Sequence, residues 1–263
     1  MLFRSSTSFT NLNTGWVQAQ GIEVDSAHGV QNSGSVVSDT DALTVKAESL
    51  DNSGTLYGAS ALRLTAAGQV HNADKGVMST AGIFWLDAGA FVNDLTGRVQ
   101  ATTGTVAELG SLTQAGTWVL SSAETGKTWP SALTVSGDAS NSGTIDSSGD
   151  LTLTAASLDN SGQISSAGRR LTVDVSAGRL HNSKLMVATA GTMDVKAQAL
   201  DNDGTLLSQG NLTVDADQIR QSDPGKLLSL GDLTLQGGSL DSTGRVGANG
   251  ALTVSLKIGR AHV

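Results

Sequence analysis

A short phrase of apolar and polar positions returns along the whole chain. Its clearest form, LDNSG, lies at Leu50–Gly54 and at Leu158–Gly162, and returns with Asp in place of Ser at Leu200–Gly204. Self-similarity with a period of about 20 residues is typical of solenoids, in which each repeat forms one coil. The Asn of the phrase, or the residue that replaces it, stands at Asn13, Asn32, Asn52, Asn72, Asn93, Gln114, Asn141, Asn160, Asn182, Asn202, Gln221 and Ser242.

Equivalent positions in successive coils stack into columns, and an inward-facing column must be apolar. Two residues before each of these anchor positions the chain is apolar in every repeat except the first, where Asn11 stands. A second column, after the turn, has no polar member. It contains Val17, Val36, Leu56, Met78, Val99, Trp118, Ile145, Ile164, Met186, Leu206, Leu227 and Val246.

A third segment of the repeat alternates apolar and polar residues, as a half-buried strand requires. Its apolar pairs are Leu43/Val45, Leu62/Leu64, Leu133/Val135, Leu151/Leu153, Leu171/Val173, Leu212/Val214, Leu233/Leu235 and Leu252/Val254. Two or three short strands per repeat predict an all-β parallel β-helix of about twelve coils, each of roughly 20 residues. Leucine-rich repeats have a similar period, but they would leave a helical segment in each unit, and none is visible.

The repeated Asn has two structural explanations. It can adopt a left-handed turn conformation that few other residues tolerate, or its amide can bond to the Asn of the next coil in a ladder. Gln114, Gln221 and Ser242 can keep a hydrogen bond but fit the left-handed turn less well. We predict one of these two roles for Asn32, Asn52, Asn72, Asn93, Asn141, Asn160, Asn182 and Asn202.

Composition narrows the possible partners. The formal net charge is −8, and Lys and Arg are not clustered, which argues against binding to nucleic acid. The chain has no cysteine, so disulfides give no information on its compartment. No apolar run reaches the length of a membrane span, and no signal-peptide core follows the first residues. An export signal would therefore lie outside this segment.

The two ends of the chain differ from the repeats. Residues 1–7 and 257–263 break the pattern and resemble scars of cloning or sequence assembly more than native caps. We therefore expect the repeats to occupy residues 8–256 of an internal fragment of a longer protein. One coil, between Gln114 and Asn141, is enlarged.

The segment LDNSGTL at residues 50–56, followed by ALRLTA at 61–66, resembles the filamentous haemagglutinin repeat. That family comprises very large surface exoproteins of Gram-negative bacteria that are secreted by two-partner systems. It includes adhesins and the stalks of contact-dependent growth-inhibition effectors. The resemblance implies a right-handed β-helical filament that passes through a dedicated outer-membrane transporter. Neither the family's amino-terminal secretion domain nor a carboxy-terminal toxin is visible in the sequence.

Motifs for catalysis, a cofactor or a metal are weak. Gly126-Lys127-Thr128 resembles the end of a phosphate-binding loop, but Ser121 stands where that motif needs its first Gly. Four His and no Cys give no zinc pattern. We therefore predict no catalytic residue, cofactor or metal ligand.

Parallel β-helices also include polysaccharide lyases and hydrolases, so a carbohydrate-active enzyme is the alternative function. Such a site needs carboxylates, with or without Lys or Arg, that converge from neighbouring coils. A solvated charge ladder between coils explains the best candidate column more simply. That column contains Asp159, His181, Asp201, Arg220 and Asp241.

The enlarged coil carries extra residues at about positions 124–130. Insertions in solenoids project from the side and often bind partners. Trp129, beside a proline, could anchor a receptor or a sugar ring, although a lid over an irregular coil would explain the same residues. The candidate partner-binding residues are Lys127, Trp129 and Pro130.

The patterns predict a rod segment without enzymatic activity, and the resemblance implies that it belongs to a secreted or cell-surface adhesin or filamentous exoprotein. The rod would hold a binding or toxic part away from the bacterial surface. The expected partners are the two-partner-secretion transporter of the outer membrane during export and a host or target-cell receptor or glycan. Nucleic acid binding and membrane insertion are not expected.

Overall fold

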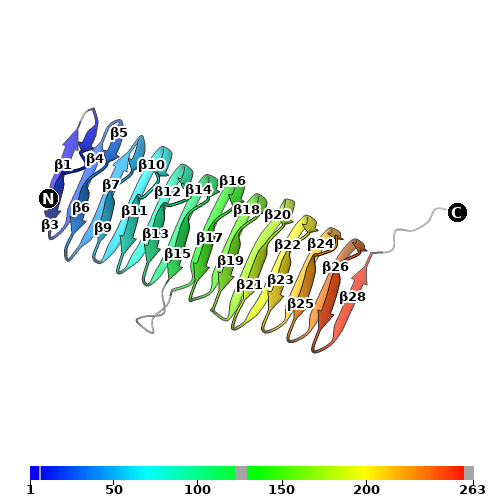
Figure 1. Cartoon of the computed structure of the whole chain (residues 1–263). Coiled ribbons are helices and arrows are strands. Elements are labelled where there is room, and N and C mark those ends of the chain that lie inside the picture. Colours follow the sequence, from blue (N-terminus) through cyan, green and yellow to red (C-terminus); the bar gives the residue numbers. More distant parts are fainter. Residues whose placement is uncertain (6, 122–128, 258–263) are drawn as a thin grey trace.

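The structure is a computed structural model that describes residues 1–5, 7–121 and 129–257. The chain winds into a straight rod with its two ends at opposite tips (Figure 1). Every strand pairing is parallel, and the strands form one 16-stranded and one 12-stranded sheet. Within the described residues there is no helix, and so none that is long and apolar enough to span a bilayer. The predicted parallel β-solenoid of about twelve coils is confirmed.

Both sheets run the length of the rod. The 16-stranded sheet contains β1 (Leu2–Ser5), β2 (Phe9–Asn11), β4 (Ile22–Ser26), β5 (Gly29–Asn32), β7 (Ala42–Ala47), β8 (Ser49–Asn52), β10 (Ala61–Asn72), β12 (Ile83–Asn93), β14 (Gly104–Gln114), β16 (Ser131–Asn141), β18 (Leu151–Asn160), β20 (Arg170–Asn182), β22 (Thr192–Asn202), β24 (Leu212–Gln221), β26 (Leu233–Ser242) and β28 (Leu252–Leu256). The 12-stranded sheet contains β3 (Trp16–Ala19), β6 (Ser35–Ser38), β9 (Thr55–Gly58), β11 (Val77–Thr80), β13 (Arg98–Ala101), β15 (Thr117–Ser121), β17 (Thr144–Ser147), β19 (Gln163–Ser166), β21 (Leu185–Ala188), β23 (Thr205–Ser208), β25 (Lys226–Ser229) and β27 (Arg245–Ala248).

The larger sheet supplies two sides of each coil. In the early coils these sides are separate strands, such as β7 and β8, and β10 joins them into one strand that pairs with both. The register of β10 with β12 shifts between Ala66 and Gln69, where the strand passes from one side of the coil to the next. Together with the smaller sheet, each coil therefore has three sides around one core.

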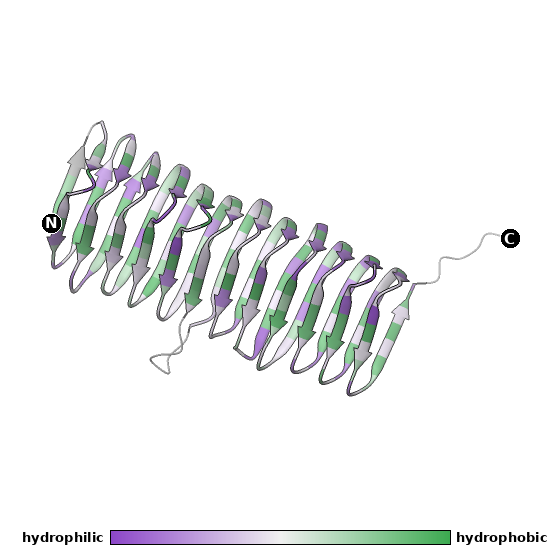
Figure 2. Cartoon of the chain, viewed as in Figure 1, coloured by the Kyte–Doolittle hydropathy of each residue, from purple (hydrophilic) through white to green (hydrophobic). Residues whose placement is uncertain are grey.

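The core consists of the predicted apolar columns. Leu206 pairs in register with Met186 on one side and Leu227 on the other, and all three side chains are fully buried. Apolar and polar residues alternate along the strands (Figure 2), and the apolar ones are buried in most coils. On β28, the pair Leu252 and Val254 is instead 51% and 46% exposed. The pattern of the 12-stranded sheet is confirmed in register from Val17 to Val246.

The glycine of the repeated phrase is required by the close stacking of the coils. A Cβ built on Gly54 would lie 2.1 Å from the carbonyl oxygen of Gly34 in the preceding coil. Gly162 stands in the same relation to the carbonyl oxygen of Gly143, also at 2.1 Å. A larger residue at these turns would push neighbouring coils apart.

The first coil corrects one prediction. The residue that pairs with Asn32 is Asn11, not Asn13, and Phe9 takes the apolar place that was assigned to Asn11. The turn after Asn11 is two residues longer than the Asn-x-Gly turn, and the amide of Gly15 closes it by donating to the carbonyl of Leu12, at 2.7 Å. The sequence suggested Asn13 because Asn13, Thr14 and Gly15 have the form of the shorter Asn-x-Gly turn.

The enlarged coil corrects a second prediction. Leu133 pairs with Leu153, so the pair equivalent to Leu151/Leu153 is Ser131/Leu133 rather than Leu133/Val135. Ser131 therefore occupies an inward place, where its hydroxyl donates to the carbonyl of Leu120 at 3.4 Å. The polar residue is tolerated there because this buried hydrogen bond satisfies it.

The start of the chain also differs from the expectation. Residues 1–7 were expected to be irregular, but β1 pairs in parallel with β4, from Leu2 with Glu23 to Ser5 with Ser26. Residues 258–263, at the other end, lie outside the described part of the chain.

Candidate functional site

The predicted Asn residues form a column inside one corner of the rod. Each is at most 1% exposed, and the amide nitrogen of one donates to the side-chain oxygen of the next. The donor–acceptor distance is 2.8 Å from Asn32 to Asn52 and 2.9 Å from Asn52 to Asn72. A second run, from Asn141 through Asn160 and Asn182 to Asn202, has distances of 2.7 to 2.8 Å.

The geometry corresponds to the ladder rather than to the left-handed turn. Among the described residues, Lys75 is the one non-glycine residue with a positive φ, so no Asn adopts the left-handed conformation. Each amide also donates to a backbone carbonyl just after the turn of the next coil, as Asn32 does to Thr55 at 3.0 Å. One side chain therefore joins two coils and satisfies a turn at the same time.

Glutamine interrupts this ladder at two places. Gln114 accepts from Asn93 at 2.9 Å, but the buried side-chain oxygen of Asn141 in the next coil has no partner. Asn202 donates to the backbone of Lys226, while the buried side-chain oxygen of Gln221 is unpartnered. We attribute both gaps to the extra methylene of Gln, which moves the amide out of line with the Asn above or below it.

The predicted charge column lies one residue upstream of the ladder and faces outward. Asp159, His181 and Asp201 are in register on successive coils. His181 contacts Asp159 through Nδ1 at 3.0 Å and Asp203 through Nε2 at 3.3 Å. The same arrangement occurs earlier, where His71 lies 3.2 Å from Asp51 and 2.9 Å from Asp94.

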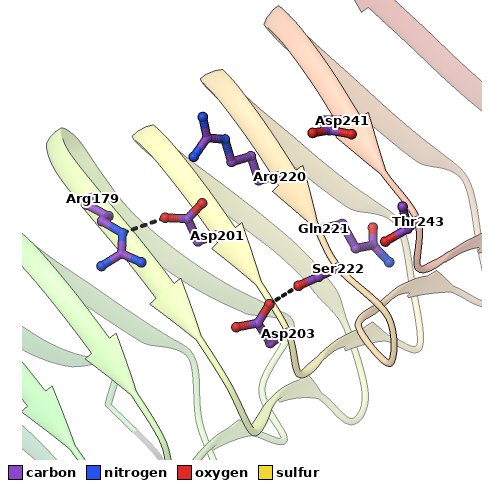
Figure 3. A pocket seen from close by; sticks show the side chains of 8 residues that line it. All are labelled: Arg179, Asp201, Asp203, Arg220, Gln221, Ser222, Asp241 and Thr243. Carbon is purple, nitrogen blue, oxygen red and sulfur yellow. Dashed lines mark hydrogen bonds and ion pairs between the residues drawn. The ribbon is translucent and has the colours of Figure 1, made fainter.

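Arg220 and Asp241 continue the charge column into a shallow hollow of about 350 Å³ (Figure 3). Arg179 forms an ion pair with Asp201 at its edge. Hydrogen bonds from Ser222 and His181, with the charges of His181 and Arg179, lower the pKa of Asp203 despite the opposing effect of burial. Most of these carboxylates are thus matched to a partner in a neighbouring coil, as in a ladder of exposed ion pairs worth about 0–1 kcal/mol each.

The predicted partner-binding loop is described only in part. Lys127 lies outside the described residues. The side chain of Trp129 is 62% exposed, and its backbone amide donates to the carbonyl of Thr103 at 2.8 Å. Pro130 lines a hollow with Asp150 and Arg169 on the following two coils. Trp129 is therefore an exposed aromatic side chain that is held to the rod through its backbone.

A second exposed tryptophan was missed by the sequence reasoning. Trp85 faces outward from β12 between the inward Phe84 and Leu86, and the guanidinium of Arg63 lies 5.3 Å from its ring centre. Asp87 and Glu108 lie beside it in the same hollow. The signal in the sequence is a Trp at the outward position of an alternating segment, where Thr is the most frequent residue in the other coils.

No group of three or more His, Cys, Asp or Glu side chains is placed to hold a metal ion in the part of the chain that the structure describes.

A family model described as "Haemagglutinin repeat" matches residues 7–74, 93–184 and 185–237. Three curated proteins are similar over most of the chain. The Deoxyribonuclease CdiA of Dickeya dadantii (strain 3937) is 31% identical over 220 residues, which are 81% of this chain and 6% of that protein. The Toxin CdiA of Escherichia coli is 30% identical over 254 residues, 93% of this chain and 7% of that protein.

The third relative is the tRNA nuclease CdiA of Escherichia coli O6:K15:H31 (strain 536 / UPEC). It is 32% identical over 251 residues, which are 93% of this chain and 7% of that protein. The chain thus spans less than a tenth of the length of these relatives. No solved structure matches it.

Proposed function

The chain belongs to the haemagglutinin repeat family, and from this premise we propose that its rod presents the toxic part of a CdiA-type exoprotein at a distance from the producing cell. The repeat region is a structural β-solenoid of a secreted or cell-surface exoprotein. Twelve coils that lie about 4.8 Å apart give a rod of roughly 55 Å.

One observation carries the proposal. Two relatives that share this stretch at 31% and 32% identity are named for different nucleases, one for deoxyribonuclease and the other for tRNA nuclease. A segment that occurs with either activity is better explained as a common scaffold than as the source of one of them. The stack of apolar columns from one end of the rod to the other has the properties of such a scaffold, because each coil rests only on its neighbours.

The rod itself is proposed to have no enzymatic activity. The alternative, a carbohydrate-active enzyme, would depolymerise a polysaccharide without any other domain. A screen of polysaccharides for new reducing ends tests this point with the purified chain, and release of reducing ends would refute the proposal.

Two kinds of partner follow from the family. During export the unfolded chain would pass through the outer-membrane transporter of a two-partner system, and the absence of cysteine leaves no disulfide to obstruct this step. On the target cell, Trp129 would contact a receptor, because an exposed Trp can supply a hot spot of about 2 kcal/mol or more.

The presenting role is tested in an exoprotein that contains this stretch and inhibits target cells. Removal of residues 8–256 should abolish or strongly reduce inhibition on contact, while the nuclease activity of a cell lysate should remain unchanged. The matched control is replacement of the same residues by an equally long β-solenoid of unrelated sequence, which should restore inhibition in part, because it supplies the length of the rod but not the contact of Trp129. Loss of nuclease activity on removal of the rod, or full inhibition without it, would contradict the proposal.

A further inference from the structure

We infer that the outer face of the 16-stranded sheet carries a binding site for a neutral glycan, centred on Trp85. The site lies on strands β7, β10, β12 and β14, away from the Asn ladder. It goes beyond the presenting role proposed above and requires only that the rod is folded.

The alternation of the strands brings the side chains of this site together. Leu62, Leu64 and Phe84 face the core, and each is at most 2% exposed. The intervening Arg63 and Trp85 therefore face outward. In register, Arg63 lies beside Trp85 and Trp85 beside Val106, one coil apart in each case.

A second outward row runs parallel to the first, two residues further along each strand. Thr65 lies beside Asp87, and Asp87 lies beside Glu108. Neighbouring coils are about 4.8 Å apart, so the aromatic ring and the two carboxylates fall within one small patch. Lys46, two coils before Asp87, closes one end of the patch.

The patch is hollowed rather than flat. Trp85 is 37% exposed and lines a hollow of about 320 Å³ together with Lys46, Arg63, Asp87 and Glu108. A second hollow of about 300 Å³ continues from Asp87 and Glu108 toward Thr134. The carboxylates thus stand in the middle of a trough that spans several coils.

This set of groups has the chemistry that a pyranose ring requires. The indole of Trp85 and the side chain of Val106 offer an apolar platform for the C–H face of a sugar. Asp87 and Glu108 accept hydrogen bonds from hydroxyl groups, and Arg63 and Lys46 donate them. The guanidinium of Arg63 lies over the indole, 5.3 Å from the ring centre, holds the ring in place and so reduces the side-chain entropy lost on binding. The sugar would pack on the part of the ring that Arg63 leaves exposed.

The charge of the patch selects a neutral ligand. The two cations, Lys46 and Arg63, balance the two anions, Asp87 and Glu108. A polyanion such as an acidic polysaccharide would place its charge against the carboxylates, and a basic peptide would meet the two cations. A neutral saccharide satisfies both sets of polar groups without leaving a charge unpaired.

Calorimetric titration of the purified chain tests the site. The neutral probes are chitopentaose, cellopentaose, maltopentaose and lacto-N-tetraose, and the charged probes are heparin and polygalacturonate. We expect at least one neutral probe to bind with a Kd of about 1 mM or tighter. Trp85→Ala should weaken that binding at least about tenfold, and Asp87→Asn and Glu108→Gln should each weaken it about fivefold.

Matched variants separate this site from the other exposed tryptophans. Trp16 and Trp129 are 65% and 62% exposed, and neither lines the hollow. Trp16→Ala and Trp129→Ala should therefore bind the probe as the wild type does. Circular dichroism checks that each variant is folded. If Trp85→Ala is not folded, Trp85→Leu, which keeps an apolar side chain, replaces it in the titration.

Two results with the wild type would overturn the inference: no neutral probe binds, or only the charged probes bind. Two results with the variants would also overturn it: Trp85→Ala and Trp85→Leu bind as the wild type does, or Trp129→Ala removes the binding. Failure of the presenting role would be visible in the inhibition assay above, which does not depend on these probes.

Discussion

The inner and outer faces of the same strands differ in burial and in how much the residue type varies from coil to coil. On β23, Leu206 is fully buried in a column that is apolar in every coil, whereas its neighbour Leu207 faces outward. On β18, Asn160 belongs to the buried ladder and Asp159, one residue before it, to the exposed charge column. The inner columns keep nearly one chemistry along the rod, with exceptions such as Ser131 and Gln221, and the outer columns vary from coil to coil. Residues that stabilise the rod and residues available to bind a partner therefore lie next to each other along the same strand.

The largest expected difference between the two faces is between Leu206→Asp and Leu207→Asp. The first variant places an unpaired carboxylate in the apolar core and should lower the free energy of unfolding by about 4 kcal/mol or more. The second should cost less than about 1 kcal/mol because its carboxylate remains in water. Urea denaturation followed by circular dichroism measures both. Equal and small losses would mean that the inward and outward assignments are wrong.

The Asn ladder gives the next largest difference. Asn160→Leu removes the acceptor for Asn141 and the donor to Asn182, which are 2.7 and 2.8 Å away, so the expected loss is about 2–4 kcal/mol. The matched outward change, Asp159→Leu, removes one exposed pair with His181 and should cost about 1 kcal/mol or less. If Asn160→Leu is as stable as the wild type, the ladder does not contribute to stability.

Repair of a gap in the ladder should stabilise the rod. Gln221→Asn would align the amide with Asn202 and satisfy the acceptor that is buried without a partner. We expect a gain of about 1 kcal/mol, or an increase of about 2–4 °C in Tm. Gln218→Asn, on the outward side of the same strand, is the control and should leave the Tm unchanged. A lower Tm for Gln221→Asn would show that Gln is the better fit at this coil.

The smallest effect concerns acid stability. The pKa of Asp203 is lowered in the folded state from its ordinary value of 3.8, mainly by the hydrogen bond from Ser222. Its contribution to stability is therefore present above about pH 4 and is lost as the pH falls through the folded-state pKa. Asp203→Asn should destabilise the rod slightly at pH 6, and the difference from the wild type should shrink at pH 2.

The check for Asp203 is urea denaturation at both pH values. Asp217→Asn, an exposed position on β24, is the control. A difference between wild type and Asp203→Asn that is larger at pH 2 than at pH 6 would contradict the assignment.

The fold was largely predictable from the sequence because buried columns restrict which residues can recur. An inward column tolerates few substitutions, so Leu158, Leu180 and Leu200 return at intervals of 22 and 20 residues and reveal the length of the coil. Equivalent residues were predicted wrongly at two places. At Asn11 the turn is longer than in other coils, and before Ser131 an insertion changes where the next strand begins. Spacing alone cannot distinguish a longer turn from a longer strand.

The candidate sites were less predictable. The outward positions follow a much weaker repeat than the inward ones, so Trp85 and Glu108 look like isolated residues until the register of neighbouring coils places them together. The charge column was found in advance because His181 and Asp201 precede the conspicuous Asn, but the contact of His181 with Asp203 across the turn was not. Recognition on such a rod depends on neighbours that are about 20 residues apart in sequence.

The central claim, that the chain is a stack of equivalent coils, is tested most directly by one distance. The chain has no cysteine, so Thr10→Cys and Ser255→Cys give two unique positions for fluorescent labels near the ends of the rod. Energy transfer between the labels should report roughly 55 Å, from coils that lie about 4.8 Å apart.

Deletion of residues 160–201 then joins Asp159 to Asn202 and restores the repeated phrase with two coils fewer. The account predicts that the deleted chain keeps its β-type circular dichroism and that the distance shortens by about 10 Å, to roughly 45 Å. An unchanged distance, or loss of β structure on deletion, would contradict it.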